Sequence, residues 1–554
     1  MVPHPHHRPH GTERRIAQEL HAHASHGVRG CSLIFIHILE NISCTTIIVD
    51  TVSRMLTTLA SPETLFPINF SAGTDWAEAE FGSIDLGDVR SSRRLVASFA
   101  SMLASPGKSI PQCTGSIAAA RGFYRLLDND LLTDTLIFNT HRAGALRRAH
   151  ASGVEVFLAI QDTTTFNFDT RKSLEGLGSI GSNNVKSSTS GLLVHSTLLT
   201  AADRNQVYGL LGAKIYARDP DKRKTEAPGT RNRESIDTKE SIRWLESYTL
   251  AREAQQRLEA LAAAHSPQGA RPLIVSVGDR EADIYELLVE AQTHRDEGMA
   301  LLVRSQFNRS LVDETEALLW ERLSASSSQG TVKLKLPRSQ GQKPRTVVLS
   351  VRFVAVEIAV PTHKRKYLNM DTPVRVNVIE LREQGVADGI CWRLVTTLPV
   401  EDLAQAIRMS RWYARRWQIE VFHRIVKSGC RVEARQLRTL SRLRPALALD
   451  MVVACCLMGM VDAARDTPEH PASDWLDPDE IEALVAYHRA GVPTGDEEPV
   501  LTIGRAVRLI GRLGGHLGRK GDGPPGAEVL WRGLAKLEAI TEAWRRFHPS
   551  NTCG

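Results

Sequence analysis

The chain has 554 residues, of which 42% are hydrophobic and 24% charged, as in an ordinary globular protein of roughly three to five domains. Its eight cysteines form no C-x-x-C pair, which favours a reduced, cytoplasmic setting over a secreted disulfide scaffold. The best candidate for a membrane span, Cys31–Ile36, is followed by His37 and Glu40 and is far shorter than the roughly 18 apolar residues that a span needs. These features exclude the membrane, disulfide-rich, fibrous and largely disordered classes, and no membrane partner is expected.

The net charge of +6 is unevenly distributed along the chain. Between Arg408 and Arg444, eleven lysines and arginines accompany two acids, so this segment carries +9 and the remainder carries −3. A basic stripe of this density is typical of a surface that binds a polyanion. A solvated helix face is the alternative interpretation.

The N-terminal quarter divides into two parts. Residues 1–70 begin with the His/Pro-rich tract MVPHPHHRPHG, which predicts a poorly structured extension, with metal binding by its histidines as the alternative. Residues 71–150 contain three stretches with apolar residues at three- and four-residue intervals, which predict a small, basic helical domain. These stretches are GDVRSSRRLVASFASMLAS, SIAAARGFYRLLDN and LLTDTLIFNTHRAGALRRA.

From residue 151 the pattern changes to that of an α/β core. The run VEVFLAI (154–160) predicts a strand buried on both faces, and further strands are expected at 191–201, 206–217, 272–277 and 301–309. A helix beginning at KESIRW is expected between the third and fourth of these strands. Alternating stretches within 311–400 predict an antiparallel β domain that interrupts the core. Residues 401–460 resume the core with the basic helix and an apolar helix at Pro445–Met460, and 461–554 are expected to be helical.

Two acidic residues follow predicted strands. Asp162 and Asp279 each lie just past the carboxyl end of an apolar run, which is the end where ligands gather in open α/β sheets. A helix cap or a turn is the ordinary role of a single Asp in this position.

A third acid, Glu420, lies on the basic helix. At about 100° per residue, Tyr413, Arg416, Glu420 and Lys427 share an arc of about 60° on one exposed stripe. The apolar residues of the same helix lie on its other side and are expected to pack on the sheet; they are Ile419, Val421, Phe422, Ile425 and Val426. An i,i+4 ion pair is the simpler interpretation of Arg416 and Glu420, but it leaves Tyr413 and Lys427 unexplained.

Three carboxylates beside clustered cations suit phosphodiester transfer. Carboxylate oxygens are good ligands for Mg²⁺ or Mn²⁺, and two such ions about 3.5–4 Å apart would assist both the attacking and the leaving oxygen. Arginine and lysine would hold the phosphates.

The spacing Tyr413-x2-Arg416-x3-Glu420-x6-Lys427, within YARRWQIEVFHRIVKSGCRVEARQ, resembles the Tyr-Arg-Glu-Lys signature of bacterial DDE transposases of the IS-four group, in particular the Tn-five type. The resemblance extends in order from about residue 75 to 545 and leaves out residues 1–70. The other segments that carry it are WAEAEFGSIDLGDVRSSRRL, PGKSI, QDTT, GLLVHSTLL, KESIRW, GDREADI, VRSQFNR and WRLVTTLPVEDLAQAIR.

The resemblance implies an RNase H-like catalytic core in which Asp162, Asp279 and Glu420 bind two metal ions. It also implies DNA contacts by eight residues. Tyr413, Arg416 and Lys427 would bind phosphates, Arg304 would lie in the active-site region, and Trp392 would accommodate a flipped base. Lys108, Arg93 and Arg94 would recognise the transposon end. Ordinary alternatives are a buried sheet aromatic for Trp392, a structural role for Arg304 and solvated side chains for the last three.

The implied activity is cut-and-paste DNA transposition, with strand nicking, hairpin formation and opening, and strand transfer into target DNA. Two protomers are expected, one on each inverted-repeat end, paired through the helix predicted at Glu528–Arg546 in a dimerisation region. The expected location is the bacterial cytoplasm, in association with the nucleoid. Alternatives are a transposase-derived DNA-binding protein or inhibitor that has lost catalysis, and a Mg²⁺-dependent phosphohydrolase of small substrates.

Overall fold

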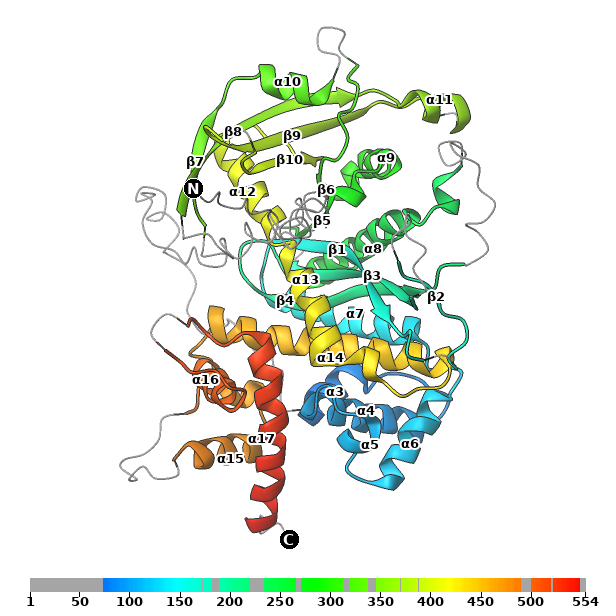
Figure 1. The fold of residues 1–554 in the computed structure, drawn as a ribbon, viewed down its shortest axis with the longest axis vertical. Helices are drawn as coiled ribbons and strands as arrows, with labels where there is room; N and C mark the ends of the chain where they lie inside the picture. Colours follow the sequence, from blue (N-terminus) through cyan, green and yellow to red (C-terminus); the bar gives the residue numbers. More distant parts are fainter. Residues whose placement is uncertain are drawn as a thin grey trace, which may run out of the picture.

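The computed structural model describes residues 73–171, 173–181, 189–219, 234–265, 271–312, 318–336, 345–368, 370–386, 388–489, 500–519 and 522–548. The predicted N-terminal extension, 1–70, lies outside the described residues. Within them the chain is mixed α/β, with a central sheet and helical N- and C-terminal regions, as the sequence predicts. Both helical regions lie below the sheet in Figure 1.

The N-terminal region consists of helices whose starts are capped by side chains. Asp88 accepts hydrogen bonds from the amides of Arg90 and Ser91 at the start of α4, and Ser116 and Thr133 cap α6 and α7 in the same manner. The three helices predicted in this region are confirmed. The helices are α3 (Gly73–Phe81), α4 (Val89–Ala104), α5 (Ile110–Cys113), α6 (Ile117–Leu127) and α7 (Asp134–Ala151).

A ten-stranded sheet forms the centre, in the order β2-β3-β1-β5-β6-β10-β9-β8-β7, with β4 also paired to β3. Strands β1, β5 and β6 are parallel, and the other pairs are antiparallel. The strands are β1 (Val156–Asn167), β2 (Gly178–Ser179), β3 (Ser190–Ala201), β4 (Val207–Tyr216), β5 (Leu273–Gly278), β6 (Met299–Arg304), β7 (Gly330–Leu336), β8 (Arg345–Ile358), β9 (Val374–Glu383) and β10 (Cys391–Thr396).

The segment 311–400 is antiparallel as predicted, but it does not form a separate sheet. Strand β10 pairs with β6, with Leu394 opposite Arg304 and Thr396 opposite Leu302, so β7–β10 extend the central sheet. Without β10, the outer edge of β6 would present unpaired backbone groups, and pairing satisfies them. The sequence pattern could not reveal this, because alternation identifies a strand without identifying its neighbour.

Both faces of the sheet are covered, as predicted for the run at 154–160. Leu158 and Ile160 of β1 face one apolar cluster, and Phe157 and Ala159 face the other. Helices α8 (Ile242–His265) and α9 (Tyr285–Thr293) cover the second face, and α13 (Trp417–Arg424) and α14 (Leu440–Asp466) cover the first. The remaining helices are α10 (Leu319–Ala325), α11 (Thr362–Leu368), α12 (Leu403–Ala414), α15 (Pro478–Arg489), α16 (Ile503–Leu513) and α17 (Ala527–Phe547).

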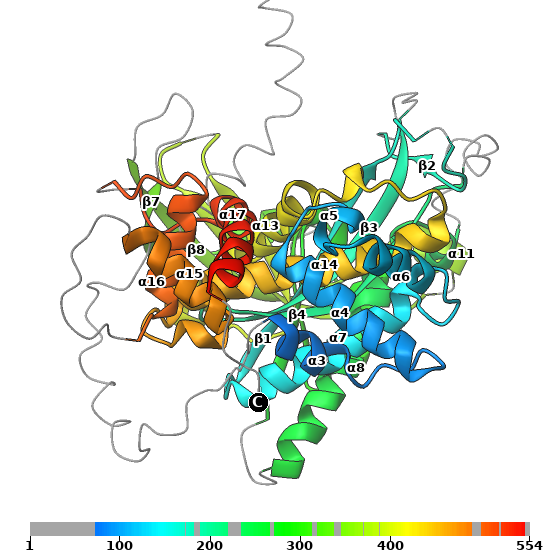
Figure 2. The same cartoon turned by 90° about the horizontal axis from the view of Figure 1, so that it is seen from below.

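Helix α14 joins the three regions of the protein. It runs between the sheet and the N-terminal helices and also contacts α16 and α17 (Figures 1 and 2). By length and composition alone α14 could cross a membrane, but 89% of its most apolar window is buried inside the protein, which is the situation of a core helix. The structure extends it well beyond the predicted Pro445–Met460, whereas the predicted terminal helix closely matches α17.

Candidate active site

Asp162 lies inside β1, not beyond its end as the sequence suggested. The parallel pairing with β5 stops at Ile160, but β1 continues antiparallel to β3, with Asp162 opposite Ser196. Asp162 therefore lies just past the point where β5 leaves the sheet, and its side chain keeps 21% of its surface exposed. The apolar run predicted only the part of the strand that is buried on both faces.

Asp279 follows the last residue of β5, as predicted. It is the cap of a short 3-10 turn, Arg280–Ala282, and its carboxylate accepts a 2.8 Å hydrogen bond from the amide of Glu281. The ordinary capping role is therefore present, and it leaves one carboxylate oxygen outside this bond. Since β1 and β5 are parallel neighbours, Asp162 and Asp279 lie at the same edge of the sheet.

Glu420 lies on α13, but the helix predicted from Tyr413 to Lys427 is not continuous. Helix α12 ends at Ala414, a turn follows at 415–416, α13 begins at Trp417, and Ile425–Gly429 form a π-helical turn. The uniform 100° step therefore does not apply, and the predicted exposed stripe is wrong: Tyr413 and Arg416 are buried. The apolar side is confirmed, since Ile419 and Phe422 are fully buried in the core cluster beside β1.

Arg416 connects two of the three acids. Its Nη1 lies 3.2 Å from Oδ2 of Asp162, and its Nη2 lies 2.5 Å from Oε1 of Glu420. Burial raises the pKa of Asp162 to about 7, against the lowering effect of the Arg416 charge; the charges of Asp279 and Glu420 raise it further. Burial lowers the pKa of Arg416, but Tyr413 and the three acids outweigh burial, so the net pKa is raised. Arg416 thus carries a fixed positive charge among three acids.

The three acids do not form a closed metal cluster in this conformation. Among the described residues, no three His, Cys, Asp or Glu side chains lie close enough together to hold one ion. Arg416 bonds to both Asp162 and Glu420, and Asp279 acts on this pair through its charge.

Tyr413, Trp392 and Arg304 are buried close to the acids. The ring of Trp392 meets that of Tyr413 edge-on at a centroid distance of 5.1 Å, and only 3% of Trp392 is exposed. The buried sheet aromatic that the sequence offered as the ordinary alternative is therefore what this conformation contains. Arg304 lies at the end of β6, is buried, and donates a 3.4 Å hydrogen bond to the carbonyl of Cys391. Burial raises the pKa of Tyr413.

The basic segment 408–444 is not a single solvated stripe. Of its eleven cations, Arg416 and Arg435 are buried beside acids, and Arg442 and Arg444 pair with Asp128 and Asp134 of the N-terminal region. The local charge of +9 is therefore partly neutralised by acids distant in sequence. Exposed arginines of this segment without an acidic partner among the described residues are Arg408, Arg411, Arg424, Arg431 and Arg438.

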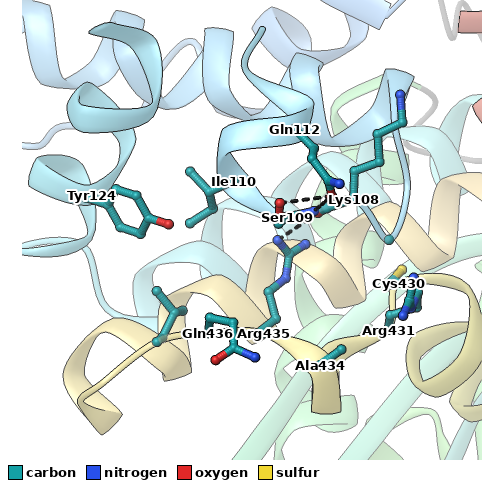
Figure 3. Close-up of a pocket in the computed structure, with 12 residues that line it drawn as sticks. Lys108, Ser109, Ile110, Gln112, Tyr124, Cys430, Arg431, Ala434, Arg435 and Gln436 are labelled. Carbon is teal, nitrogen blue, oxygen red and sulfur yellow. Dashed lines mark hydrogen bonds between the residues drawn. The ribbon is translucent and has the colours of Figure 1, made fainter. Parts of the chain in front are cut away.

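The other predicted DNA contacts lie in two places. Lys427 is partly buried in the π-helical turn, and burial lowers its pKa. Lys108 is partly exposed between α4 and α5 (Figure 3), while Arg93 is exposed and Arg94 partly exposed on α4.

Two arginines near the site were not singled out from the sequence. Arg280 follows Asp279 directly, and burial together with the charge of Arg304 lowers its pKa. Arg435 lies buried against Asp450 of α14. An acid in the middle of a strongly apolar helix was the available signal for Asp450, since such an acid requires a buried partner.

Three regions of the chain match known protein families. Residues 73–132 match the family described as Transposase DNA-binding, residues 270–456 match Transposase DDE domain, and residues 452–552 match Transposase Tn5 dimerisation domain. The DDE match contains Asp279 and Glu420 but begins after Asp162.

A DNA-binding, a DDE and a dimerisation match in this order define a DNA transposase that binds DNA and forms dimers. The chain belongs to the Tn5-type DDE transposases, since its dimerisation match is to the Tn5 family. DDE transposases typically depend on a divalent metal, and a cytoplasmic location is consistent with these matches.

Proposed function

We propose that this transposase catalyses cut-and-paste transposition of an insertion sequence, through strand nicking, hairpin formation and opening, and strand transfer. One observation carries the proposal: Arg416 bonds to both Asp162 and Glu420, although Asp162 lies 254 residues away from Arg416 in the chain. The two acids and the arginine therefore form one charged group. Asp279 contributes to that group through its charge. Acids that are distant in the sequence and gather at a partly exposed edge of the sheet are the arrangement that a metal-dependent phosphodiester transfer requires.

The acids fit a divalent metal in donor chemistry. They offer carboxylate oxygens, which Mg²⁺ and Mn²⁺ prefer, and the burial and repulsion that raise the pKa of Asp162 would be relieved by a bound cation. Asp162, Asp279 and Glu420 would hold two ions, with Mg²⁺ the first choice and Mn²⁺ an alternative. When bound, such ions help to activate the attacking oxygen and to stabilise the leaving one. Arg416 would have to release at least one of the two acids.

The cations of the site would bind the DNA backbone. Arg416 presents a planar set of donors suited to a phosphate, and the released guanidinium would turn from carboxylate to phosphate. Lys427 and Tyr413 would bind phosphates of the same DNA strand. Arg304 would contribute positive charge next to them. Because Trp392 is buried, it could receive a flipped base only after the side chains that cover it, among which Tyr413 touches its ring, are rearranged.

The division of the chain follows from these roles. We infer end recognition by 71–150, including Lys108, Arg93 and Arg94, and an RNase H-like catalytic core formed by 151–310 and 401–460. The β4-β3-β1-β5-β6 order, antiparallel and then parallel, supports this core. Residues 311–400 would be an insertion that extends the core sheet, and 461–554 would pair two protomers, each on one inverted-repeat end in the nucleoid.

The test is cleavage of end DNA by the full chain and its Glu420→Gln variant. Labelled duplexes tiled across the DNA on both sides of the coding sequence are screened for binding, and the tightest is used with Mg²⁺ or Mn²⁺. We expect Glu420→Gln to bind this duplex without cutting it, because the amide keeps the shape but loses the metal-binding charge. Glu401→Gln is the matched control, since Glu401 is an exposed acid just before α12.

Two results would oppose the proposal. If Glu420→Gln cut the duplex at the wild-type rate, Glu420 would not be a metal ligand. Binding by the wild-type chain without cutting under either ion would favour the alternative, a transposase-derived DNA-binding protein or inhibitor.

A further inference from the structure

The loop that follows β6, residues 305–309, begins at the same edge of the sheet as the acids. Gly278, the last residue of β5, pairs with Val303, so Arg304 ends β6 level with Asp279. Strands β5 and β6 are parallel neighbours, and neighbouring strands lie about 4.8 Å apart. The loop therefore starts one strand spacing from Asp279, which is comparable with one or two nucleotide steps of about 3.4 Å along a DNA strand.

A buried carboxylate ties this loop to the short turn that Asp279 begins. Asp283 ends that turn, and its Oδ2 accepts hydrogen bonds from the amides of Gln306 at 2.7 Å and Phe307 at 3.0 Å. Its Oδ1 accepts bonds from Nε of Arg309 at 3.0 Å and from Nη2 at 2.6 Å. The side chain of Asp283 is fully buried, and bonds to a buried charge are strong. The backbone of Phe307 thus has a fixed place one turn away from Asp279.

The side chain of Phe307 is exposed on this fixed backbone. It keeps 51% of its surface accessible, and in the part of the chain that the structure describes the other exposed phenylalanine is Phe547, at the end of α17. The guanidinium of Arg309, itself held by Asp283, lies 5.3 Å from the centre of the Phe307 ring. This cation–π contact restrains the ring and leaves about half of the residue open to a partner.

Arginines beside Asp279 supply positive charge at the same edge. Arg304 ends β6, and Arg280 follows Asp279 and is partly exposed. Burial, and after it the charge of Arg304, lowers the pKa of Arg280, so the two guanidinium groups lie near each other. Cations that can hold phosphates next to an accessible aromatic ring are the pattern of a surface that binds DNA with unpaired bases.

We propose that Phe307 is a stacking platform for an unpaired base of the DNA that lies at the acids. The proposal rests on the proposed function, whose hairpin step requires distorted DNA next to the cut. An aromatic face accepts any base, so the contact would hold the DNA without reading its sequence. Trp392 is buried, whereas Phe307 is accessible without a rearrangement. The contact is made by the chain whose acids are engaged, whichever protomer recognises the end, and the base belongs either to the end DNA or to the target.

The first test is a set of substitutions at this exposed position in the full-length protein. Phe307→Ala removes the ring, Phe307→Leu keeps an apolar side chain without an aromatic face, and Phe307→Tyr keeps the ring. We expect the second-order rate constant for single-turnover cleavage of the end duplex with Mg²⁺ to fall about 5- to 150-fold in the first two variants, and to be restored in Phe307→Tyr. Val312→Ala is the control, because it truncates another exposed apolar side chain just beyond the loop, and it should cut like the wild type.

The second test identifies the base. Abasic sites are placed one at a time along both strands of the end duplex, and the wild type and Phe307→Ala are compared in Kd without divalent metal and in cleavage with Mg²⁺. If Phe307 stacks on one base, removal of that base weakens the wild type but has no further effect on Phe307→Ala. A target base is detected in strand transfer from a precut end, where Phe307→Ala would be slow although it cuts normally.

Three results would overturn the proposal. They are wild-type rates of both cleavage and strand transfer in Phe307→Ala, wild-type behaviour of Phe307→Leu, and a cleavage defect of Phe307→Ala that persists at every abasic position. If the wild-type chain binds the duplex without cutting it, the proposed function fails, but the Kd values still decide the stacking. One abasic site that abolishes the affinity difference between wild type and Phe307→Ala would then support stacking, and the lack of such a site would refute it.

Discussion

We expect low pH to weaken the attachment of the N-terminal helices to the sheet, because it protonates one buried carboxylate, that of Glu80 on α3. Its side chain is 1% exposed and bonds to Arg148 at 2.6 Å and to Nδ1 of His141, both on α7. The other ring nitrogen of His141 accepts a 2.9 Å hydrogen bond from the amide of Leu210 on β4. The three side chains thus form one polar network between α3, α7 and the sheet.

The size of the effect follows from the pKa of Glu80. Burial alone would raise this pKa, but the charge of Arg148, the electrostatic attraction of the His141 ring and the hydrogen bonds from both side chains lower it from 4.5 to about 2. The difference corresponds to roughly 3 kcal/mol of unfolding free energy. Because the folded-state pKa is the lower one, this stabilisation is complete above about pH 4.5 and is lost as the pH falls from about 4.5 towards 2.

Urea denaturation at pH 7 and at pH 3 measures this contribution. Glu80→Gln should lose roughly 3 kcal/mol at pH 7 and should lose less on acidification than the wild-type protein, because the titrating group is gone. Glu78→Gln is the control, since Glu78 is exposed on the same helix. If wild type and Glu80→Gln lost equal stability between pH 7 and pH 3, the network would not be the source of acid sensitivity.

Two further expectations concern DNA. Trp392→Ala should cost about 3–5 kcal/mol of unfolding free energy, because it removes a side chain that is only 3% exposed. Under conditions where the variant is folded, gels should show impaired hairpin formation while nicking persists. Equal loss of both steps would instead assign Trp392 a structural role. The affinity for end DNA should fall steeply with salt, and Arg424→Gln should reduce the slope of log Kd against log salt by about one; a salt-independent Kd would contradict phosphate binding by the exposed arginines.

Local patterns predicted most elements of this fold. The β-branched run at 154–160 predicted a strand buried on both faces, and alternation between the two apolar clusters confirms it. Apolar residues at three- and four-residue intervals predicted the helices that the structure contains as α4, α6 and α7. These signals succeed because the spacing of apolar side chains involves residues within one or two turns.

The candidate site was predicted in its residues more than in its geometry. The spacing of Tyr413, Arg416, Glu420 and Lys427 identified the segment, but a regular helix was assumed where the chain turns at 415–416. That turn buries Tyr413 and Arg416 instead of exposing them. A helix break without glycine or proline has no local signature, because packing against the sheet decides it.

The sequence by itself determined which acids, cations and apolar faces the protein possesses, because composition and periodicity belong to the chain. The tertiary structure alone decided their partners: Arg416 with Asp162, Arg442 with Asp128, and Arg435 with both Asp450 and the turn at Lys108. Coulomb and hydrogen-bond energies depend on separation in space, and folding brings together groups that are distant along the chain. A local charge of +9 in the sequence therefore became in part a junction between regions, and the five exposed arginines of the segment are the ones proposed to bind DNA.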